Sequence, residues 1–291
     1  MRTIIPPPTF AHTSVPTSAP TSRIGPGKAW VLGACLGAGL ACPLAAHAEE
    51  PLSTDRPDFV ESSDVMAPGR WQVETGLQSE RAQADGLKSR TTTTPLLLRL
   101  GVGHALELRL ETDGAVRSTT TDTASGTTVR ERGFSDLSPG LKWRMRDGDE
   151  AQGTPAIAWL VHVDVDSGSR AFRGRGLRPS LRVVAEWELP QEFSVGVMPG
   201  LRFDKDDDGS RFTSGLVAVT VTKALSPAWH AFAELAGDDL GARPHRQPVQ
   251  FFDTGVTYLV TESLQLDASV TRGLTSAAPD LAWGVGLSMR F

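Results

Sequence analysis

Cysteine is nearly absent from this 291-residue sequence, which contains only Cys35 and Cys42. Both lie in residues 1–48, a stretch that we expect to be removed as a signal peptide. The mature chain would then contain no thiol. Structural disulfides and thiolate catalysis are therefore excluded from the function classes that we consider for it.

Long apolar runs are also scarce, and the one present, residues 29–46, is close to the N-terminus. It follows Arg2, Arg23 and Lys28, and it ends in Ala46-His47-Ala48, the small-residue pattern that signal peptidase recognises. We expect cleavage after Ala48. An uncleaved membrane anchor and lipidation of Cys35 or Cys42 are the alternatives. No other run is long enough to cross a membrane as a helix.

Positive charge is in deficit. The formal net charge is −5, and it becomes −8 when the three cations before Glu49 are removed with the signal peptide. An acidic balance of this kind is not typical of nucleic-acid binding. We therefore expect no nucleic-acid partner.

Catalytic and metal-binding motifs are missing as well. Residues 49–291 contain no G-x-S-x-G serine motif, and the histidine spacings do not match zinc sites. The segment 204–209 starts like a calcium-binding loop, but Gly215 stands where the bidentate carboxylate is required. His162 and Asp164 on one strand face leave a barrel hydrolase as a minor alternative. We expect no enzyme activity, no metal and no cofactor.

The sequence does contain strands in which apolar and polar residues alternate. The last, Leu281–Phe291, has Leu, Trp, Val, Leu, Met and Phe on one face and Ala, Gly, Gly, Ser and Arg on the other. Period two predicts strands with one apolar face. We expect twelve strands, at residues 70–80, 91–100, 105–111, 137–146, 155–166, 178–189, 193–204, 212–223, 228–235, 249–260, 263–272 and 281–291.

Short and long connections between these strands alternate, except at residues 147–154, which should be short and are not. Outer-membrane barrels have short periplasmic turns and long external loops. This layout places both termini in the periplasm. It also places Trp71, Trp187, Phe193, Trp229, Tyr258 and Phe291 near the periplasmic interface, and Phe134, Phe203 and Phe212 near the outer one. The prediction is an all-β antiparallel transmembrane barrel in the cell outer membrane, and a soluble β-sandwich is the alternative.

Several short motifs occur in a fixed order along the chain. They are Thr54-Asp55-Arg56-Pro57-Asp58-Phe59-Val60-Glu61-Ser62, Pro68-Gly69-Arg70-Trp71-Gln72-Val73-Glu74, Gly133-Phe134-Ser135-Asp136-Leu137, and Phe252-Asp253-Thr254-Gly255-Val256. In this order and spacing the chain resembles the outer-membrane transporter family named for the MetA pathway of phenol degradation. The resemblance implies a barrel that carries small aromatic or hydrophobic molecules, without catalytic residues.

The predicted facing of the strands directs many charged side chains into the lumen. The positions that we expect to line a solute path are Glu107, Arg109, Lys142, Arg144, Asp164, Arg182, Glu186, Arg202, Asp253 and Arg290. Further inward positions are Glu74, Glu111, His162, Glu234 and Asp267. Because a twelve-stranded lumen is intermediate between filled and open, these charges either form a selective polar path or pair with one another and seal the interior.

Residues 49–69 precede the first strand and do not alternate. They contain Asp55, Arg56, Asp58 and Glu61, which we expect to fold into the lumen as a plug, with a disordered periplasmic tail as the alternative. The barrel itself would span residues 70–291.

The predicted function is passive passage of a small-molecule solute, and a sealed structural or adhesive barrel is the alternative. Pro95, Pro139, Pro155, Pro179 and Pro199 suggest a variant in which hydrophobic solutes leave sideways through the wall, although such prolines also mark simple bends. Outer-membrane lipid is an expected partner. The barrel assembly machinery is another, through the strand that ends at Phe291.

Overall fold

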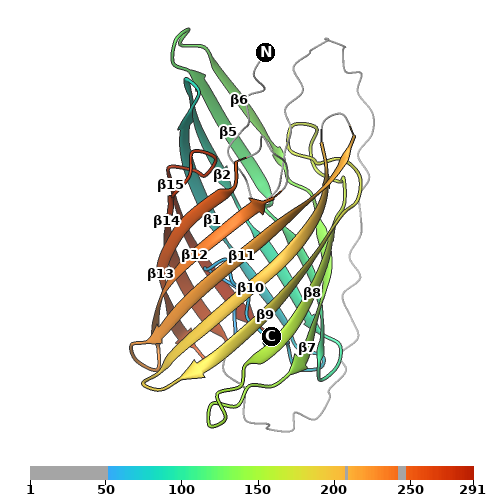
Figure 1. Ribbon diagram of the computed structural model, residues 1–291, viewed down its shortest axis with the longest axis vertical. Helices are drawn as coiled ribbons and strands as arrows, with labels where there is room; N and C mark the ends of the chain where they lie inside the picture. Colours follow the sequence, from blue (N-terminus) through green and yellow to red (C-terminus); the bar gives the residue numbers. More distant parts are fainter. Residues whose placement is uncertain (1–51, 207–208, 242–246) are drawn as a thin grey trace, which may run out of the picture.

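The computed structural model describes residues 52–206, 209–241 and 247–291. The predicted signal peptide lies outside the described residues. None of the described residues belongs to a helix that is long and apolar enough to cross a membrane. The described chain consists of antiparallel strands wound into one barrel (Figure 1).

Fifteen strand segments make up this barrel. They are β1 (Trp71–Ala84), β2 (Leu87–Thr93), β3 (Leu96–Gly101), β4 (Leu106–Thr112), β5 (Ala115–Asp122), β6 (Thr128–Phe134), β7 (Ser138–Arg146), β8 (Ala156–Asp164), β9 (Arg178–Leu189), β10 (Phe193–Lys205), β11 (Arg211–Ala224), β12 (Trp229–Leu240), β13 (Val249–Thr261), β14 (Leu264–Gly273) and β15 (Leu281–Arg290). Twelve of them form the closed wall, in the order β1, β3, β4, β7 to β15. The predicted twelve-stranded barrel is confirmed.

The wall closes between its first and last strands. β1 and β15 are antiparallel neighbours from the pair Gln72 and Arg290 to the pair Arg81 and Leu281. The amide of Phe291 donates to the carbonyl of Trp71 at 2.8 Å, and the two rings stack with centroids 4.1 Å apart. Closure removes the unpaired sheet edge, which could not be satisfied in lipid.

Three segments, β2, β5 and β6, continue the wall beyond the barrel rim, where β5 and β6 form the tallest part of the molecule in Figure 1. The long polar link between the predicted strands at 105–111 and 137–146 contains a hairpin of β5 and β6 that the sequence analysis did not identify. β2 is separated from β3 by Pro95, which cannot donate to the ladder, and β4 from β5 by Gly114 at φ +66°. Because this hairpin is rich in Thr and Arg and lacks an apolar face, period-two hydrophobicity did not reveal it.

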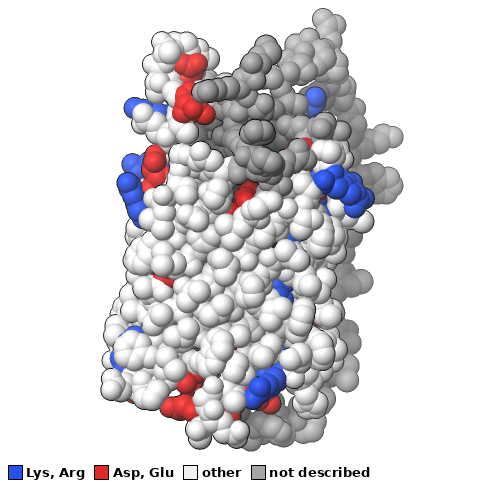
Figure 2. Space-filling model, viewed as in Figure 1, with Lys and Arg blue, Asp and Glu red and all other residues white. Residues whose placement is uncertain are grey.

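The outer face of the wall is apolar between its two ends. Leu108, Leu266 and Val285 are each 46–47% exposed, as expected for side chains that contact lipid rather than protein. Figure 2 shows a broad uncharged belt on the side in view, with Lys, Arg, Asp and Glu mostly toward the two ends. Trp229 and Tyr258 lie together at the end of the belt near the short turns, with ring centroids 4.6 Å apart. The arrangement is that of an outer-membrane barrel.

Proline positions do not break the twelve-stranded wall. Pro139, Pro179 and Pro199 lie within β7, β9 and β10, and Pro155 directly precedes β8. Pro95 lies between β2 and β3, and its carbonyl accepts hydrogen bonds from Gly76 and Thr75. Pro139 and Pro179 have register partners on β4 and β8, whereas the β9–β10 register has no pair between Val197 and Gly200, around Pro199. The strands themselves continue through these three prolines, which favours the simpler interpretation that they mark bends.

Candidate functional site: a segment folded into the lumen

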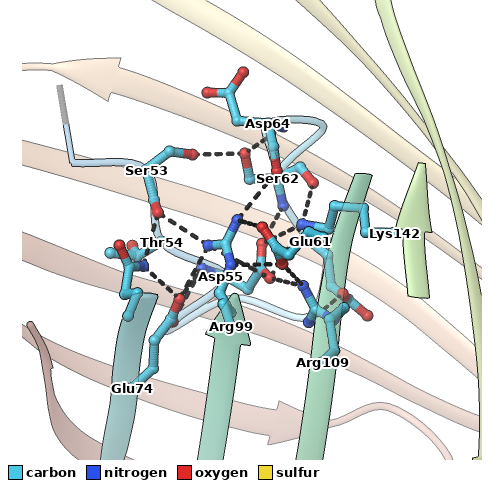
Figure 3. A network of polar contacts seen from close by, with 12 residues as sticks. Ser53, Thr54, Asp55, Glu61, Ser62, Asp64, Glu74, Arg99, Arg109 and Lys142 are labelled. Atoms are coloured by element: carbon cyan, nitrogen blue, oxygen red, sulfur yellow. Dashed lines mark hydrogen bonds and ion pairs between the residues drawn. The ribbon is translucent and has the colours of Figure 1, made fainter. Parts of the chain in front are cut away.

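Residues 52–66 lie inside the barrel, where Figure 3 shows Asp55 and Glu61 beside side chains of the neighbouring strands β1, β3, β4 and β7. The side chain of Asp55 contacts Lys142 on β7, and Arg56 contacts Asp267 on β14. Val60 is 3% exposed, and Met66 6%. A disordered periplasmic tail is not what the structure shows for these residues.

Carboxylates of four different strands accept hydrogen bonds from the backbone of this segment. Glu74 on β1 accepts from the amides of Asp55 and Arg56, and Glu234 on β12 accepts from those of Phe59 and Val60 at 2.9 and 2.8 Å. An irregular segment has no sheet partner, so its buried N–H groups must be satisfied by side chains. Hydrogen bonds to charged acceptors are the stronger kind.

Two further carboxylates bind the returning part of the segment. Glu186 on β9 accepts from the amide of Ser63 at 2.5 Å, and Glu107 on β4 accepts from that of Met66 at 2.9 Å. The segment is therefore anchored along its length rather than at one end.

Asp55 is the centre of a buried charge cluster. Its carboxylate lies 2.5 Å from the Arg109 guanidinium and 3.0 Å from the Lys142 ammonium. Burial alone would raise the pKa of Asp55, but the positive charges of Arg99, Lys142 and Arg109 hold that pKa well below its usual range. Asp55 is therefore a carboxylate, and its charge is balanced by the wall.

Arg99 on β3 is the residue of this cluster that sequence reasoning missed. Its guanidinium is fully buried and lies 2.8 Å from Glu107 and 3.1 Å from Glu74, and it donates to the carbonyls of Ser53 and Asp64. The signal was present: a lone Arg between Leu98 and Leu100 in an apolar strand must face away from lipid, because period two places both leucines on the opposite face.

Glu61 extends the cluster toward β8 and β9. It pairs with Arg109 at 2.8 Å and with Arg182. Glu111 and His162 lie beside it, with ligand atoms of the three residues within 4.8 Å of one another. Such spacing could hold a cation, but Arg109 and Arg182 already supply the positive charge at this point. We therefore interpret the group as part of the charge cluster.

The tip of the segment meets acidic wall residues instead. Burial and the carboxylates of Glu234, Glu186 and Asp253 raise the pKa of Asp58 well above its ordinary value. Asp253 also accepts hydrogen bonds from the Thr254 amide and the Thr271 hydroxyl. All four residues of the predicted plug, Asp55, Arg56, Asp58 and Glu61, therefore lie within the lumen.

The residues predicted to line a solute path do not all lie together. Glu107, Arg109, Lys142, Arg182 and Glu186 all contact residues 52–66. Outside that cluster, Asp164 pairs with Arg178 at 3.4 Å, Arg202 pairs with Asp238 and Asp239 at 2.9 and 2.8 Å, and Arg290 donates to the carbonyl of Glu262 in a turn. Arg144 is intermediate: its side chain is 28% exposed, and its guanidinium lies 3.4 Å from the Asp64 carboxylate.

Two glycines make room for Arg56. A Cβ added at Gly286 would lie 2.5 Å from the Arg56 guanidinium and 2.7 Å from Asp267, and one added at Gly76 would lie 2.8 Å from the same guanidinium. The Arg56–Asp267 pair, at 3.0 Å, thus needs small residues on β1 and β15.

Gly286→Ala should displace Arg56 and loosen the segment, because the new methyl group overlaps charged atoms that have little freedom to move. We expect faster cleavage of residues 52–66 by an added protease in the folded, detergent-solubilised protein. Gly284→Ala is the matched control, since the nearest atom to its Cβ would be Cγ of the flexible Gln78 side chain, at 3.3 Å. Equal cleavage rates in the two variants would contradict the prediction.

The lumen also contains an apolar cluster, which sequence reasoning missed. A buried cluster from β8 to β13 and the β14–β15 loop contains Leu160, Val184, Met198, Leu216, Ala218, Ala236, Val249, Phe251 and Ala278, with Val60 of the segment. The ring of Phe59 meets Phe251 edge-on at 5.7 Å. The available signal was the unbroken apolar run of residues 156–161 and that of 216–219, since lipid-facing and lumen-facing positions are both apolar there.

Comparison with known proteins places the chain in a family. Residues 54–291 match the family described as "Putative MetA-pathway of phenol degradation". None of the curated proteins matches.

Three similar solved structures are all barrels. An outer membrane channel from Pseudomonas putida F1 has TM-score 0.58 and 15% identity, over 79% of this chain and 98% of that one. The translocator domain of the autotransporter NalP from Neisseria meningitidis has TM-score 0.48 and 14% identity, over 78% and 90%. The CymD monoaromatic hydrocarbon channel has TM-score 0.42 and 11% identity, over 78% and 89%.

At 15% identity the outer membrane channel from Pseudomonas putida F1 supports the fold alone, whereas the family match covers almost the whole described chain. The barrel, its closing strand and the motifs of residues 54–62 agree with that match, and the chain belongs to the family described by the MetA pathway of phenol degradation.

Proposed function

We propose that this protein is a channel for passive passage of small aromatic or hydrophobic molecules across the outer membrane, and that residues 52–66 are its plug. The observation that carries the proposal is an apolar cluster inside a lumen that is otherwise charged. Met198 on β10 and Phe251 on β13 belong to this cluster, and β9 and β12 add the charged Glu186 and Glu234 beside it. A lumen for water-soluble solutes alone would be polar all round.

Membership of this family and the likeness to the outer membrane channel from Pseudomonas putida F1 support the same proposal. In this proposal the chain consists of a signal peptide at residues 1–48, a lumenal segment at 49–69 and a barrel at 70–291. Two partners are also included, outer-membrane lipid and the assembly machinery, which would recognise the exposed Phe291 beside Trp71.

One small cavity lies in the lumen beside residues 52–66. This cavity of about 40 Å³ lies on the external side of the Arg56–Asp267 pair, among residues that include Gln78, Glu80 and Thr271. It can hold a few water molecules, so we propose that a solute passes only when residues 52–66 move. A permanently sealed structural barrel is the competing function.

A catalytic role is not part of the proposal. His162, the residue that raised it, lies 3.2 Å from both Glu111 and the Arg109 guanidinium. These contacts favour a place in the charge cluster rather than activation of a nucleophile.

Swelling of liposomes that contain the purified protein tests the channel. Sodium benzenesulfonate and sodium methanesulfonate are matched anions that cross bilayers slowly and differ in the aromatic ring. We expect benzenesulfonate to enter several-fold faster than methanesulfonate, because the ring can contact the apolar cluster in the lumen. Met198→Asn should remove most of this preference, and Met198→Leu should retain it.

Entry of neither anion into liposomes that contain correctly folded barrels would favour the sealed structural barrel. Entry of both at equal rates, unchanged by Met198→Asn, would support a channel but contradict the aromatic selectivity.

A further inference from the structure

The extension formed by the outer part of β1 with β2, β5 and β6 has a cationic outer face. Its members are Arg81, Lys88, Arg90, Arg117, Arg130 and Arg132, all exposed. Period two places them on the face that continues the lipid-facing side of the wall, since Thr91 and Val116, on the opposite face, are buried. We name these six residues the cationic face.

Strand register assembles them into a grid. Arg81 is the cross-strand partner of Arg90, and Arg117 is that of Arg132. Thr119 lies between Arg90 and Arg130, with each of them as a register partner. Neighbouring strands are about 4.8 Å apart, so the cations on paired strands are close neighbours.

Such an arrangement is unfavourable without a counter-charge, because like charges directly opposite on a sheet repel. The carboxylates of the extension form no ion pair with these cations. Glu80 borders the internal cavity, Glu131 is on the inner face as the partner of Ser118, Asp122 accepts hydrogen bonds from two amides of its own turn, and Asp85 lies in the turn between β1 and β2. In the described part of the chain, the six residues of the cationic face form no ion pair. The ion pairs there are made by other cations, such as Arg56, Arg109 and Arg202.

The position of the face indicates which anion it meets. Toward the membrane the same outer surface carries Phe134, two residues from Arg132 on β6 and 65% exposed. On β15 it carries Trp283, two residues from the Leu281 that pairs with Arg81. Aromatic residues mark the membrane interface. The cations therefore follow immediately outside it, at the level of lipid headgroups.

We propose that the cationic face binds the phosphate groups of the glycolipid, lipopolysaccharide, that forms the outer leaflet of the outer membrane. Its inner sugars carry several phosphates close together, which matches a grid of guanidinium groups that favour bidentate phosphate contacts. The site is independent of the lumen and of the proposed transport function. It anchors the extension against the membrane surface.

Binding of purified lipopolysaccharide to the full-length mature protein in an uncharged detergent tests this proposal. Arg117→Gln with Arg132→Gln should weaken binding by roughly fivefold for each cation removed. Arg146→Gln with Lys223→Gln is the matched control, because it removes two cations at the opposite end of the barrel. High salt and enzymatic dephosphorylation of the lipid should each weaken binding to the unaltered protein.

Thr119→Glu is a second variant that keeps both arginines. It places a carboxylate between Arg90 and Arg130 and should also weaken binding. A heat-dependent gel shift in each variant verifies that the barrel is folded. Equal affinity of the cationic-face variants and the control would overturn the proposal, and so would unchanged binding of dephosphorylated lipid. Tighter binding of heparin or duplex DNA than of lipopolysaccharide would assign the face to a polymeric anion and overturn it as well.

Discussion

Deletion of residues 52–66 is expected to raise the single-channel conductance of the barrel several-fold. The segment occupies the lumen between the charged wall and the apolar cluster, and it is bound through Glu74, Glu107, Glu186 and Glu234. Without it, water can hydrate the charges that face it, while the backbone ladder of twelve strands still holds the wall together. Recording from planar bilayers, after a heat-dependent gel shift has verified folding, measures the effect.

A reversible cross-link provides the control for this deletion. A Cβ added at Gly196 would lie 2.9 Å from Cγ1 of Val60, which is close enough for a disulfide in Val60→Cys with Gly196→Cys. Both natural cysteines precede the proposed cleavage point, so no other thiol should compete in the mature chain. We expect low conductance when the pair is oxidised and recovery on reduction. High conductance in the oxidised form would show that solutes pass without movement of the segment.

Replacing Arg99 is expected to have the largest effect on stability. Its fully buried guanidinium balances Glu74 and Glu107 and donates to two carbonyls of the plug. Removing one partner of a buried charge group leaves the others uncompensated and typically costs about 3–5 kcal/mol. Arg99→Met should therefore markedly lower the temperature at which the compact, fast-migrating gel form of the barrel converts to the unfolded form.

Arg144→Met is the matched comparison. Arg144 is 28% exposed and pairs with Asp64 and Asp147, whose side chains are 53% and 83% exposed. Exposed ion pairs contribute about 0–1 kcal/mol, so the conversion temperature should barely change. Similar losses in the two variants would mean that the cluster around Arg99 is solvated and not a structural centre.

How much of the fold could be predicted depends on whether the local sequence alternates between apolar and polar residues. Strand positions such as 70–80 and 281–291 could be read because alternation is a local property of the chain and the membrane makes one face of each strand apolar. The β5–β6 hairpin could not, because its strands project beyond the lipid and have no apolar face. The apolar lumen cluster escaped for the converse reason, since strands such as β8 and β11 are apolar on both faces.

What the sequence by itself determined is a twelve-stranded outer-membrane barrel with charged residues directed inward and a family-specific segment before the first strand. Only the tertiary structure decided which charges meet. Arg56 reaches Asp267 and Asp55 reaches Lys142 across 211 and 87 positions of the chain, and Arg117 is placed opposite Arg132 by register. The physical reason is that alternation sets the face of each side chain, whereas its neighbours depend on ladder register and on closure of the wall.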